Sequence, residues 1–248
     1  MTSELRELVG TVVVVTGAGS GIGAATTAAL LEAGANVVAG ELHPERLDPF
    51  IAGWGEDRFV AVAADVRSPE AAAALIAGGV DRWGRVDSIV ANAGVGFFGG
   101  ALDYNGEQIT MMTETNFLGT VWLARQAVKH YRERGDGGDI ILLGSVAGLG
   151  SGGGNEAIYA ATKAAQMAFG TSLDREVRSE GIRVSTVAPA AVNTGFAAST
   201  GRFGDTEPAD AEFIKPADLA FAILTTLRQP RRIRTALWSI WSLAEDNG

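Results

Sequence analysis

A tyrosine and a lysine stand one helical turn apart in a stretch rich in helix-forming residues. Tyr159 and Lys163 are four positions apart, which places both side chains on one face of a helix. A free tyrosine has a pKa near ~10, and a nearby ammonium favours the phenolate and lowers that value. Such a phenol can protonate a ketone oxygen or deprotonate an alcohol while a hydride moves at the adjacent carbon. The pair therefore indicates acid/base chemistry, although the same spacing also occurs by chance on ordinary helices.

Three more polar residues are expected near the carboxyl edge of the predicted sheet. Ser145 follows a strand expected at 139–143, where its hydroxyl either holds a substrate oxygen beside the phenol or only serves a turn. Asn92, in Asn92-Ala-Gly, follows another strand and is otherwise a turn former. Asn116 lies inside a predicted helix, where an amide is a poor helix former. Its side chain is therefore expected either to take part in the site at this edge or to bind the backbone of a neighbouring strand. The carboxyl ends of parallel strands share one edge, so we expect these residues to line one rim.

Residues 12–31 predict a strand, a glycine-rich turn and a helix. Four consecutive valines indicate a strand buried on both faces, and residues 24–31 are helix formers without Gly or Pro. The turn carries glycines at 17, 19, 21 and 23, which let the backbone approach an anion closely. The helix start adds unpaired N–H groups and the positive end of its dipole. We expect a phosphate cradle here, although a lone glycine motif can equally be a structural bend.

The remaining sequence alternates strand and helix signals. This alternation predicts a single α/β domain over residues 1–248, with a parallel sheet, right-handed crossovers and helices on both faces. Two irregular stretches, 148–154 and 190–215, interrupt this alternation, the second as a loop or lid. The substrate is expected between residues 148–155 and 196–213. The further strands are expected at 36–40, 58–64, 86–91, 139–143 and 182–187, the last broken by Pro189, with 233–241 either a final strand or a packing segment. The further helices are expected at 44–51, 68–83 with Ser68 as cap, 107–134, 156–179 ended by Gly181, and 215–228.

Composition excludes several classes of protein. The net charge of −9 argues against a general nucleic-acid binder, and no apolar run approaches the roughly 20 residues of a membrane helix. The first ten residues lack the apolar core of a signal peptide. Without cysteine there are no disulfides, which fits a reducing, cytoplasmic compartment, and with His43 and His130 as the only histidines no metal site is expected. A basic cluster is interpreted as a solvated turn beside Pro230 rather than an anion site. It comprises Arg228, Arg231, Arg232 and Arg234.

The residues around the second predicted strand bear on nucleotide preference. Glu41 ends that strand about 20 residues after the glycine-rich turn, where an acid accepts hydrogen bonds from ribose hydroxyls and repels a 2′-phosphate. Ser20 and Leu42 offer no cation for such a phosphate. These residues favour NAD over NADP. The alternative is that Glu41 is a solvated surface acid, and Arg46, one helical turn further on, could supply a cation for a 2′-phosphate. Asp65, ending the third strand, is either a contact to the adenine amino group or a helix cap.

Taken together, the motifs resemble those of the single-domain short-chain dehydrogenase/reductases. The resemblance covers about residues 8–194 and implies a Rossmann-type, doubly wound sheet of about seven parallel strands. It also implies a catalytic tetrad. Tyr159 would be the general acid/base, Lys163 would bind the nicotinamide ribose and lower the tyrosine pKa, Ser145 would orient the substrate carbonyl, and Asn116 would hold a water in a proton relay. The motifs that carry it are Thr16-Gly-Ala-Gly-Ser-Gly-Ile-Gly23, Asn92-Ala-Gly94, Asn116, Ser145 and Tyr159-x-x-x-Lys163.

The resemblance extends to the binding residues. Pro189-Ala-Ala-Val-Asn-Thr194 corresponds to a family segment in which Val192 and Thr194 would contact the nicotinamide carboxamide. The residues expected at the nucleotide are Gly17, Gly19, Ser20, Gly21, Ile22, Gly23, Glu41, Leu42, Asp65, Val66, Asn92, Ala93, Gly94, Tyr159, Lys163, Pro189, Val192 and Thr194. Those expected at the substrate are Ser145, Leu149, Tyr159 and Phe196, with Phe97 and Phe98 as further aromatic wall.

The function expected is an NAD(H)-dependent oxidoreductase acting on a hydrophobic ketone or secondary alcohol, since the candidate lining is mostly apolar. An NADPH-dependent reductase of 3-oxoacyl thioesters is an alternative, opposed by Glu41, Ser20 and Leu42. A non-catalytic nucleotide sensor on the same fold is another, opposed by the intact tetrad. Because family members pair the helices that carry Asn116 and Tyr159 between subunits, a homotetramer is expected, with a dimer as the alternative.

Three departures from the family pattern are visible. The interval of 14 positions from Ser145 to Tyr159 is one longer than is common, and we expect the extra residue in 152–155, altering the pocket wall. Ala190 and Ala91 replace a usual glycine and a common asparagine, and both changes look tolerable. The segment after Gln229 lacks the usual glycine-rich ending, so the resemblance does not extend to a last strand or a subunit contact there.

Overall fold

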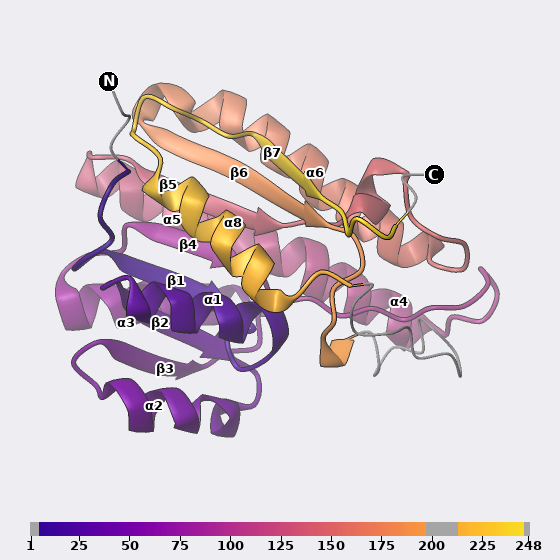
Figure 1. The fold of residues 1–248 in the computed structure, drawn as a ribbon, viewed down its shortest axis with the longest axis horizontal. Helices are drawn as coiled ribbons and strands as arrows, with labels where there is room; N and C mark the ends of the chain where they lie inside the picture. Colours follow the sequence, from indigo (N-terminus) through magenta and orange to yellow (C-terminus); the bar gives the residue numbers. More distant parts are fainter. Residues whose placement is uncertain (1–4, 197–212, 246–248) are drawn as a thin grey trace.

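The fold is a seven-stranded, all-parallel sheet, as predicted (Figure 1). The structure, a computed structural model, describes residues 5–196 and 213–245. Neighbouring strands follow the order β3-β2-β1-β4-β5-β6-β7, so the chain runs outward from β1 in one direction and then returns to build the other half. The strands are β1 (Val12–Thr16), β2 (Asn36–Glu41), β3 (Phe59–Ala63), β4 (Ser88–Ala91), β5 (Gly138–Leu143), β6 (Ile182–Pro189) and β7 (Leu237–Ile240).

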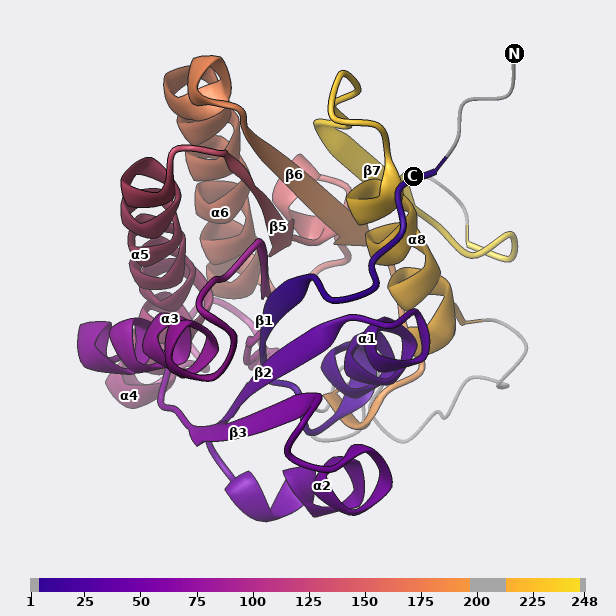
Figure 2. The same ribbon diagram turned by 90° about the vertical axis from the view of Figure 1, so that its left-hand side faces the viewer.

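Helices cover both faces of the sheet (Figure 2). On one face α1 (Gly21–Glu32) packs against α8 (Pro216–Arg228). On the other face α3 (Pro69–Trp83), α5 (Gly119–Arg134) and α6 (Ala157–Val177) lie side by side. The short α2 (Asp48–Trp54) borders β3, and α4 (Gly106–Met112) leads into α5. None of the helices in the described ranges is long and apolar enough to cross a membrane.

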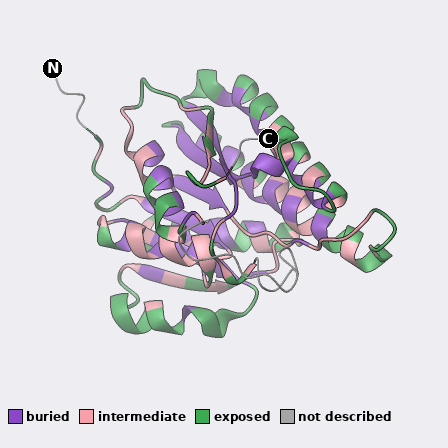
Figure 3. Ribbon diagram, turned by 45° about the vertical axis from the view of Figure 1, so that its right-hand side comes forward, coloured by how far each residue is buried: buried purple, intermediate pink, exposed green. Residues whose placement is uncertain are grey.

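The valines of β1 show why this sequence forms a central strand. Val13 and Val15 pack into the core under α1 and α8, whereas Val12 and Val14 pack into the core under α3, α5 and α6. All four are fully buried, because alternate side chains of a strand point to opposite faces and both faces are covered. Figure 3 shows the same layering, with buried strands inside and the exposed residues on the outer helix surfaces.

Most predicted element ends are confirmed, and the exceptions have local causes. Ser68 caps α3 by accepting the N–H groups of Glu70 and Ala71, and Gly181 takes a left-handed φ of 75° before β6. Pro189 does not break the sixth strand as predicted: β6 continues to it, and the ladder goes on through the Ala190 N–H, which donates to the Ile240 carbonyl at 2.8 Å. The uncertain segment after 233 forms a true strand, parallel to β6.

The helix predicted at 107–134 contains an irregular turn. Residues Thr113–Leu118 form a π-helical turn between α4 and α5, and this turn carries Asn116. The helix predicted at 44–51 is also interrupted, since a 3₁₀ turn (Pro44–Leu47) precedes α2. The sequence pattern predicted helix in both places, but periodicity does not distinguish the tighter and wider turns from an α-helix.

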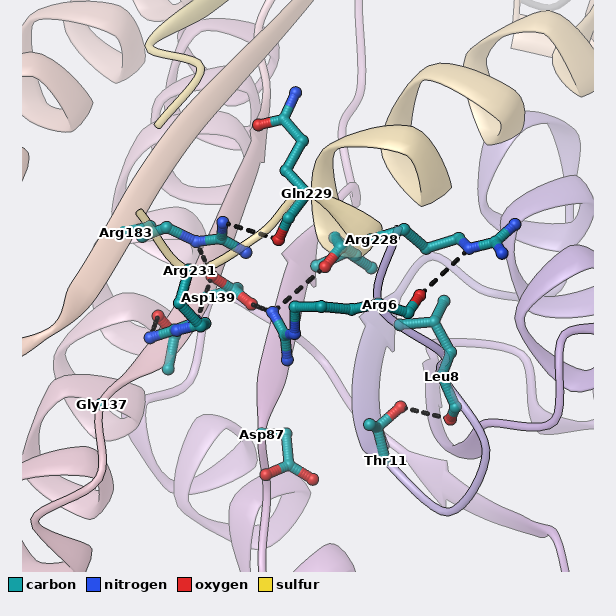
Figure 4. Close-up of polar contacts among 12 residues, drawn as sticks. Arg6, Leu8, Thr11, Asp87, Gly137, Asp139, Arg183, Arg228, Gln229 and Arg231 are labelled. Atoms are coloured by element: carbon teal, nitrogen blue, oxygen red, sulfur yellow. Dashed lines mark hydrogen bonds and ion pairs between the residues drawn. The ribbon is translucent and has the colours of Figure 1, made fainter. Parts of the chain in front are cut away.

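A buried carboxylate ties the N-terminal segment and the turn after α8 to the sheet, at the end where β5 and β6 begin (Figure 4). Asp139 accepts hydrogen bonds from Arg183 at 2.6 Å and Arg231 at 2.8 Å, and Arg6 lies 3.4 Å away. Arg231 therefore has a specific partner, and Arg234 pairs with the buried Asp174. The basic cluster lies at an exposed turn, as predicted, but Arg231 and Arg234 also pair with buried acids from β5 and α6, which the interpretation did not include.

One prediction concerns His130 on α5. Its Nε2 accepts the Val86 N–H at 3.0 Å, which requires the neutral imidazole. Burial and the nearby Arg134 lower its pKa, against smaller opposing effects of Glu133 and Asp87. Because the folded chain favours the neutral form, this contribution to stability is present above about pH 6.5, the unfolded pKa, and is lost as the pH falls below it.

We therefore expect the free energy of unfolding, measured in urea between pH 8 and pH 5, to fall less steeply in His130→Gln than in the parent chain. The expected difference is about 1 kcal/mol, the value of one such hydrogen bond. His43→Gln, at an exposed position, is the matched control. Equal slopes for the parent and His130→Gln would contradict the assignment.

Candidate active site

A cleft of about 550 Å³ opens at the carboxyl ends of the central strands, the end to which the strand arrowheads point in Figure 1. The glycine-rich turn after β1 forms one side, and the residues after β4, β5 and β6 form the others. It brings together most of the predicted site residues from 180 positions of sequence. Those lining it are Gly17, Ser20, Gly21, Ile22, Asn92, Ala93, Gly94, Ser145, Tyr159, Lys163, Pro189, Val192, Thr194 and Phe196.

The glycine-rich turn has no room for side chains. Gly17 has a φ of +62°, and a Cβ built on it would lie 3.1 Å from both the Cα of Ala93 and Nδ2 of Asn92. A Cβ on Gly23 would collide with the Gly17 carbonyl. Helix α1 starts at Gly21, and the side chain of its N-cap Ser20 makes no capping hydrogen bond. The first-turn N–H groups of α1 therefore remain available to an anionic group such as a pyrophosphate.

Asn92 ties this turn to the end of β4. Its Nδ2 donates to the carbonyls of Thr16 at 2.8 Å and Gly17 at 3.2 Å. The N–H groups of Asn92 and Ala93 in turn donate to Oγ1 of Thr16, both at 3.1 Å. Thr16 was quoted in the motif but not predicted as a functional residue. Its position as the last residue of a buried strand was the available signal.

Glu41 is not the solvated surface acid that was the alternative in the sequence analysis. Its side chain is 5% exposed, and one oxygen accepts the Gly19 N–H at 3.0 Å. Arg46 lies 3.8 Å from the other oxygen and lines the cleft. Sequence reasoning placed Arg46 only as a residue that could swing in, because the 3₁₀ turn that carries it over the glycine-rich turn was not predicted.

Several predicted nucleotide residues lie outside the cleft lining. Asp65 forms a two-pronged ion pair with Arg67, which lowers the pKa of its carboxyl, and it does not cap α3, since Ser68 does. Val66 packs against Gly119 at the start of α5, and Leu42 is exposed. Whether these three approach an adenine remains a prediction. Gly19, Gly23 and Glu41 support the turn from behind its lining residues.

Lys163 and Tyr159 project from the first turns of α6 into the cleft. Nζ of Lys163 lies 5.8 Å from the centroid of the Tyr159 ring and donates to the Leu143 carbonyl at 2.8 Å. Lys163 is 3% exposed, and burial lowers its pKa from 10.5 to about 7. The structure thus places an amine that exchanges its proton near neutral pH beneath the phenol.

Ser145 stands between the fifth strand and α6. Its Oγ accepts the Ala147 N–H at 3.2 Å, which caps the 3₁₀ turn Val146–Leu149, and it lies 3.5 Å from the Pro189 carbonyl. The turn role that was the alternative for Ser145 is therefore real, and the same residue also lines the cleft. Leu149, predicted at the substrate, is 43% exposed and does not line it.

Asn116 lies behind the cleft wall and is fully buried. Its Oδ1 accepts the Val95 N–H at 2.8 Å, and its Nδ2 donates to the Val95 carbonyl at 2.9 Å and to Oγ1 of Thr162 at 3.0 Å. Asn116 does bind backbone, but that of Val95 in the loop after β4 and not that of a neighbouring strand, as the alternative had it. The water relay implied by the resemblance remains a prediction.

Aromatic rings surround the phenol on its open side. The ring centroid of Tyr159 lies 5.5 Å from that of Phe98 and 6.0 Å from that of Phe196, and Phe98 and Phe196 meet edge to face. Phe97 lines the cleft beside them. The predicted aromatic wall is therefore present. The loop or lid predicted at 190–215 lies mostly outside the described residues, at 197–212.

The wall segment expected to hold the additional residue is pinned by the loop after β4. Asn155 adopts a left-handed φ of 60°, unusual for a residue with a side chain. Its carbonyl accepts both the Gly99 N–H at 2.8 Å and the Tyr104 hydroxyl at 3.1 Å. These bonds hold the wall next to the aromatic residues that face Tyr159.

Comparison with known proteins agrees with this geometry. The family model described as short chain dehydrogenase matches residues 11–203. Versicolorin reductase 1 of Aspergillus parasiticus is 36% identical over 204 residues, which cover 81% of this chain and 76% of that protein. Two solved structures superpose closely. The 3-ketoacyl-(acyl-carrier-protein) reductase of Brucella melitensis complexed with NADH has a TM-score of 0.85, 28% identity and coverage of 96% and 99%. A serine dehydrogenase complexed with NADP+ has a TM-score of 0.86, 25% identity and coverage of 95% and 96%.

Substitution of Gly17 tests whether the turn is a nucleotide cradle. Gly17→Ala introduces both left-handed strain and a Cβ inside the cradle, whereas Gly135→Ala, at a φ of +78° with open space around it, introduces only the strain. Each variant is expected to lose about 1–2 kcal/mol of unfolding free energy. We expect weaker NADH binding, measured by fluorescence titration, only in Gly17→Ala. Equal NADH affinities in both variants would contradict the cradle.

Proposed function

Because this chain belongs to the short-chain dehydrogenase family, we propose that it is an NAD(H)-dependent oxidoreductase of hydrophobic ketones or secondary alcohols, with Tyr159 as the general acid/base. The observation that carries the proposal is the convergence of Tyr159, Lys163 and the glycine-rich turn on one cleft. Family membership and the complete polar tetrad favour an enzyme over the nucleotide sensor considered from the sequence.

The cleft offers a place for the pyrophosphate and the nicotinamide half of a dinucleotide. The space kept free by Gly17 and Gly23 and the N–H groups at the start of α1 would receive the pyrophosphate. Lys163 would bind the nicotinamide ribose, and Val192 and Thr194, which also line the cleft, would contact the carboxamide. When bound, the nicotinamide supplies or accepts the hydride.

The protein side of the reaction is proton transfer and orientation. In the reductive direction Tyr159 gives its hydroxyl proton to the ketone oxygen, and Ser145 holds that oxygen beside the phenol. Lys163, whose Nζ lies 5.8 Å from the ring centroid, would stabilise the resulting phenolate in its protonated form. The phenolate would in turn favour the charged amine and oppose the effect of burial on the lysine pKa. In the oxidative direction the phenolate removes the alcohol proton. Asn116 would hold the water through which the proton reaches solvent.

NAD is the preferred nucleotide in this proposal. The buried Glu41 carboxylate lies at the glycine-rich turn, where it would bind ribose hydroxyls and repel a 2′-phosphate. The Arg46 guanidinium also lies at the glycine-rich turn, where a cation would favour a 2′-phosphate and so oppose this preference. In the structure it is paired with Glu41. Related structures hold either nucleotide, one with NADH and one with NADP+.

The walls around Tyr159 favour an apolar substrate. Phe97, Phe98 and Phe196 surround the phenol, and within the described lining the cations are Lys163 and Arg46, neither placed for a substrate carboxylate. Versicolorin reductase 1 is by name a reductase of a particular compound, and its similarity is consistent with a carbonyl substrate here. A 3-oxoacyl thioester is the second candidate, favoured by the similarity to the Brucella reductase. Turnover of acyl thioesters but not of simple hydrophobic ketones would favour it.

A homotetramer, or a dimer, is part of the same proposal. Ala161, Ala164 and Ala168 lie exposed on the outer face of α6, where small side chains permit close packing of a second copy. A cytoplasmic location remains a prediction of the cysteine-free sequence.

Replacement of Tyr159 by Phe tests the acid/base assignment. It removes the proton that must reach the substrate oxygen, so we expect turnover to fall by roughly 10²–10⁴-fold with NADH affinity nearly unchanged. Tyr131→Phe is the control, since the Tyr131 hydroxyl donates to the carbonyl of Asp139 near the start of β5, at the opposite end of the sheet from the cleft. NADH oxidation against a panel of ketones is the measurement. An unchanged rate in Tyr159→Phe would overturn the proposal.

Glu41→Gln and Arg46→Ala test nucleotide preference. Removing the carboxylate charge should lower the ratio of kcat/KM for NAD to that for NADP by about tenfold, and removing the guanidinium should raise it. Glu45→Gln, exposed on the same 3₁₀ turn, is the control and should leave the ratio unchanged. A parent chain that works better with NADP than with NAD would show that Arg46 rather than Glu41 decides.

A further inference from the structure

A chain of buried hydrogen bonds runs from α6 to the π-helical turn that carries Asn116. Gln166 donates from Nε2 to Oγ1 of Thr120 at 2.6 Å, and the Thr120 hydroxyl donates to the Asn116 carbonyl at 2.8 Å. Thr120 has one hydroxyl proton, which goes to that carbonyl, so its oxygen is free to accept from Gln166. Neither Thr120 nor Gln166 lines the cleft.

Stability does not explain a glutamine at this position. Gln166 is fully buried, and its Oε1 has no hydrogen-bond partner among the described residues. Burying an amide with one polar atom unpaired is unfavourable, and a leucine or methionine of similar size would fill the space without that cost. The favourable element at this site is therefore the one bond that Gln166 does make, to Thr120.

With that bond, two residues of α6 hold the π-helical turn in place. Thr162 accepts a hydrogen bond from the Asn116 side chain, while Gln166, through Thr120, fixes the Asn116 main chain. Thr162 and Gln166 stand beside Lys163 on α6. A π-helical turn leaves carbonyls without their usual partners, so its shape depends on such side-chain donors.

The position of Asn116 in turn controls the cleft wall next to Lys163. The Asn116 side chain holds Val95 through two hydrogen bonds. The neighbouring Gly94 lies between Asn116 and Lys163. A Cβ on Gly94 would lie 3.3 Å from Oδ1 of Asn116 and 3.6 Å from Nζ of Lys163. A small displacement of Asn116 would therefore alter the surroundings of the Lys163 amine.

We propose that Gln166 and Thr120 are positioning residues for catalysis, which hold the π-helical turn so that Asn116 and the Gly94–Val95 wall keep Lys163 in its working environment. The inference rests on the proposed oxidoreductase function. It assigns these two residues a role in kcat and its pH dependence, with nucleotide binding little affected.

The experiment compares Thr120→Val, Gln166→Leu and the double variant with the parent enzyme. Each single variant is expected to lower kcat by about tenfold and to shift the pH midpoint of kcat, while the Kd for NADH changes by less than about twofold. The kcat of the double variant should be no lower than that of the less active single variant, because the two residues act through the same chain of hydrogen bonds. Thr120→Ser keeps the hydroxyl and should restore the parent kcat and pH midpoint.

Thr226→Val is the matched control. Thr226 is also buried and donates its hydroxyl to the carbonyl four residues earlier, that of Ala222 at 2.9 Å, but it lies on α8 away from the cleft lining. It should lower Tm without moving kcat or its pH midpoint. If Thr120→Val fails to fold, Gln166→Leu alone carries the comparison.

Two results overturn the inference. If Thr120→Val and Gln166→Leu behave as Thr226→Val does, or if their effects on kcat multiply in the double variant, the pair has no shared positioning role. Tyr159→Phe, assayed in parallel, separates this failure from that of the proposed function. A fully active Tyr159→Phe variant overturns both the proposed function and the positioning role. An inactive Tyr159→Phe, together with unaffected Thr120→Val and Gln166→Leu variants, overturns the positioning role alone.

Discussion

The site depends on keeping one amine buried beside one phenol. Lys163 reaches from α6 to the carbonyl of Leu143, the last residue of β5, and this hydrogen bond fixes its Nζ under the Tyr159 ring. Removing an ammonium from water is costly, and the lowered pKa of Lys163 expresses that cost. The surrounding elements have to be rigid enough to maintain this burial, and they are, since β5 lies between two paired strands and α6 packs over it.

The sequence was sufficient for the parts of the molecule that follow local rules. Four valines specify a strand covered on both faces, Ser68 and Gly181 mark helix ends, and alternating elements specify a parallel sheet. The close sequence spacing of Tyr159 and Lys163 also sufficed to predict that they share a helix face. In each case the determining interaction lies within a few residues or within one repeating pattern.

Other features depend on contacts between distant segments, which no local pattern encodes. The π-helical turn at Asn116 is held by Thr162 and by Gln166 through Thr120, and Arg46 reaches the cleft only because a 3₁₀ turn carries it over Gly19. The basic residues after α8 were interpreted as solvated because Asp139 and Asp174 are distant in sequence. These three features were missed because each depends on a neighbour from elsewhere in the fold.

The two ends of the sheet divide the work of the molecule. At the amino ends of the strands, Asp139 and its arginines join the N-terminal segment and the turn after α8 to β5 and β6, and these contacts serve stability. At the carboxyl ends, glycines, a buried amine and a buried glutamine are all unfavourable for stability on their own. Their concentration around one cleft is the physical signature of a site selected for chemistry.

The central claim is that the Lys163 ammonium makes the neighbouring phenol easier to ionise. The pH dependence of kcat/KM for alcohol oxidation, compared between the parent enzyme and Lys163→Met, measures this directly. The account predicts that the pH at which the required base loses its proton moves upward in Lys163→Met, towards the value of ordinary tyrosine near ~10. An unchanged midpoint, with the variant as active as the parent, would contradict it.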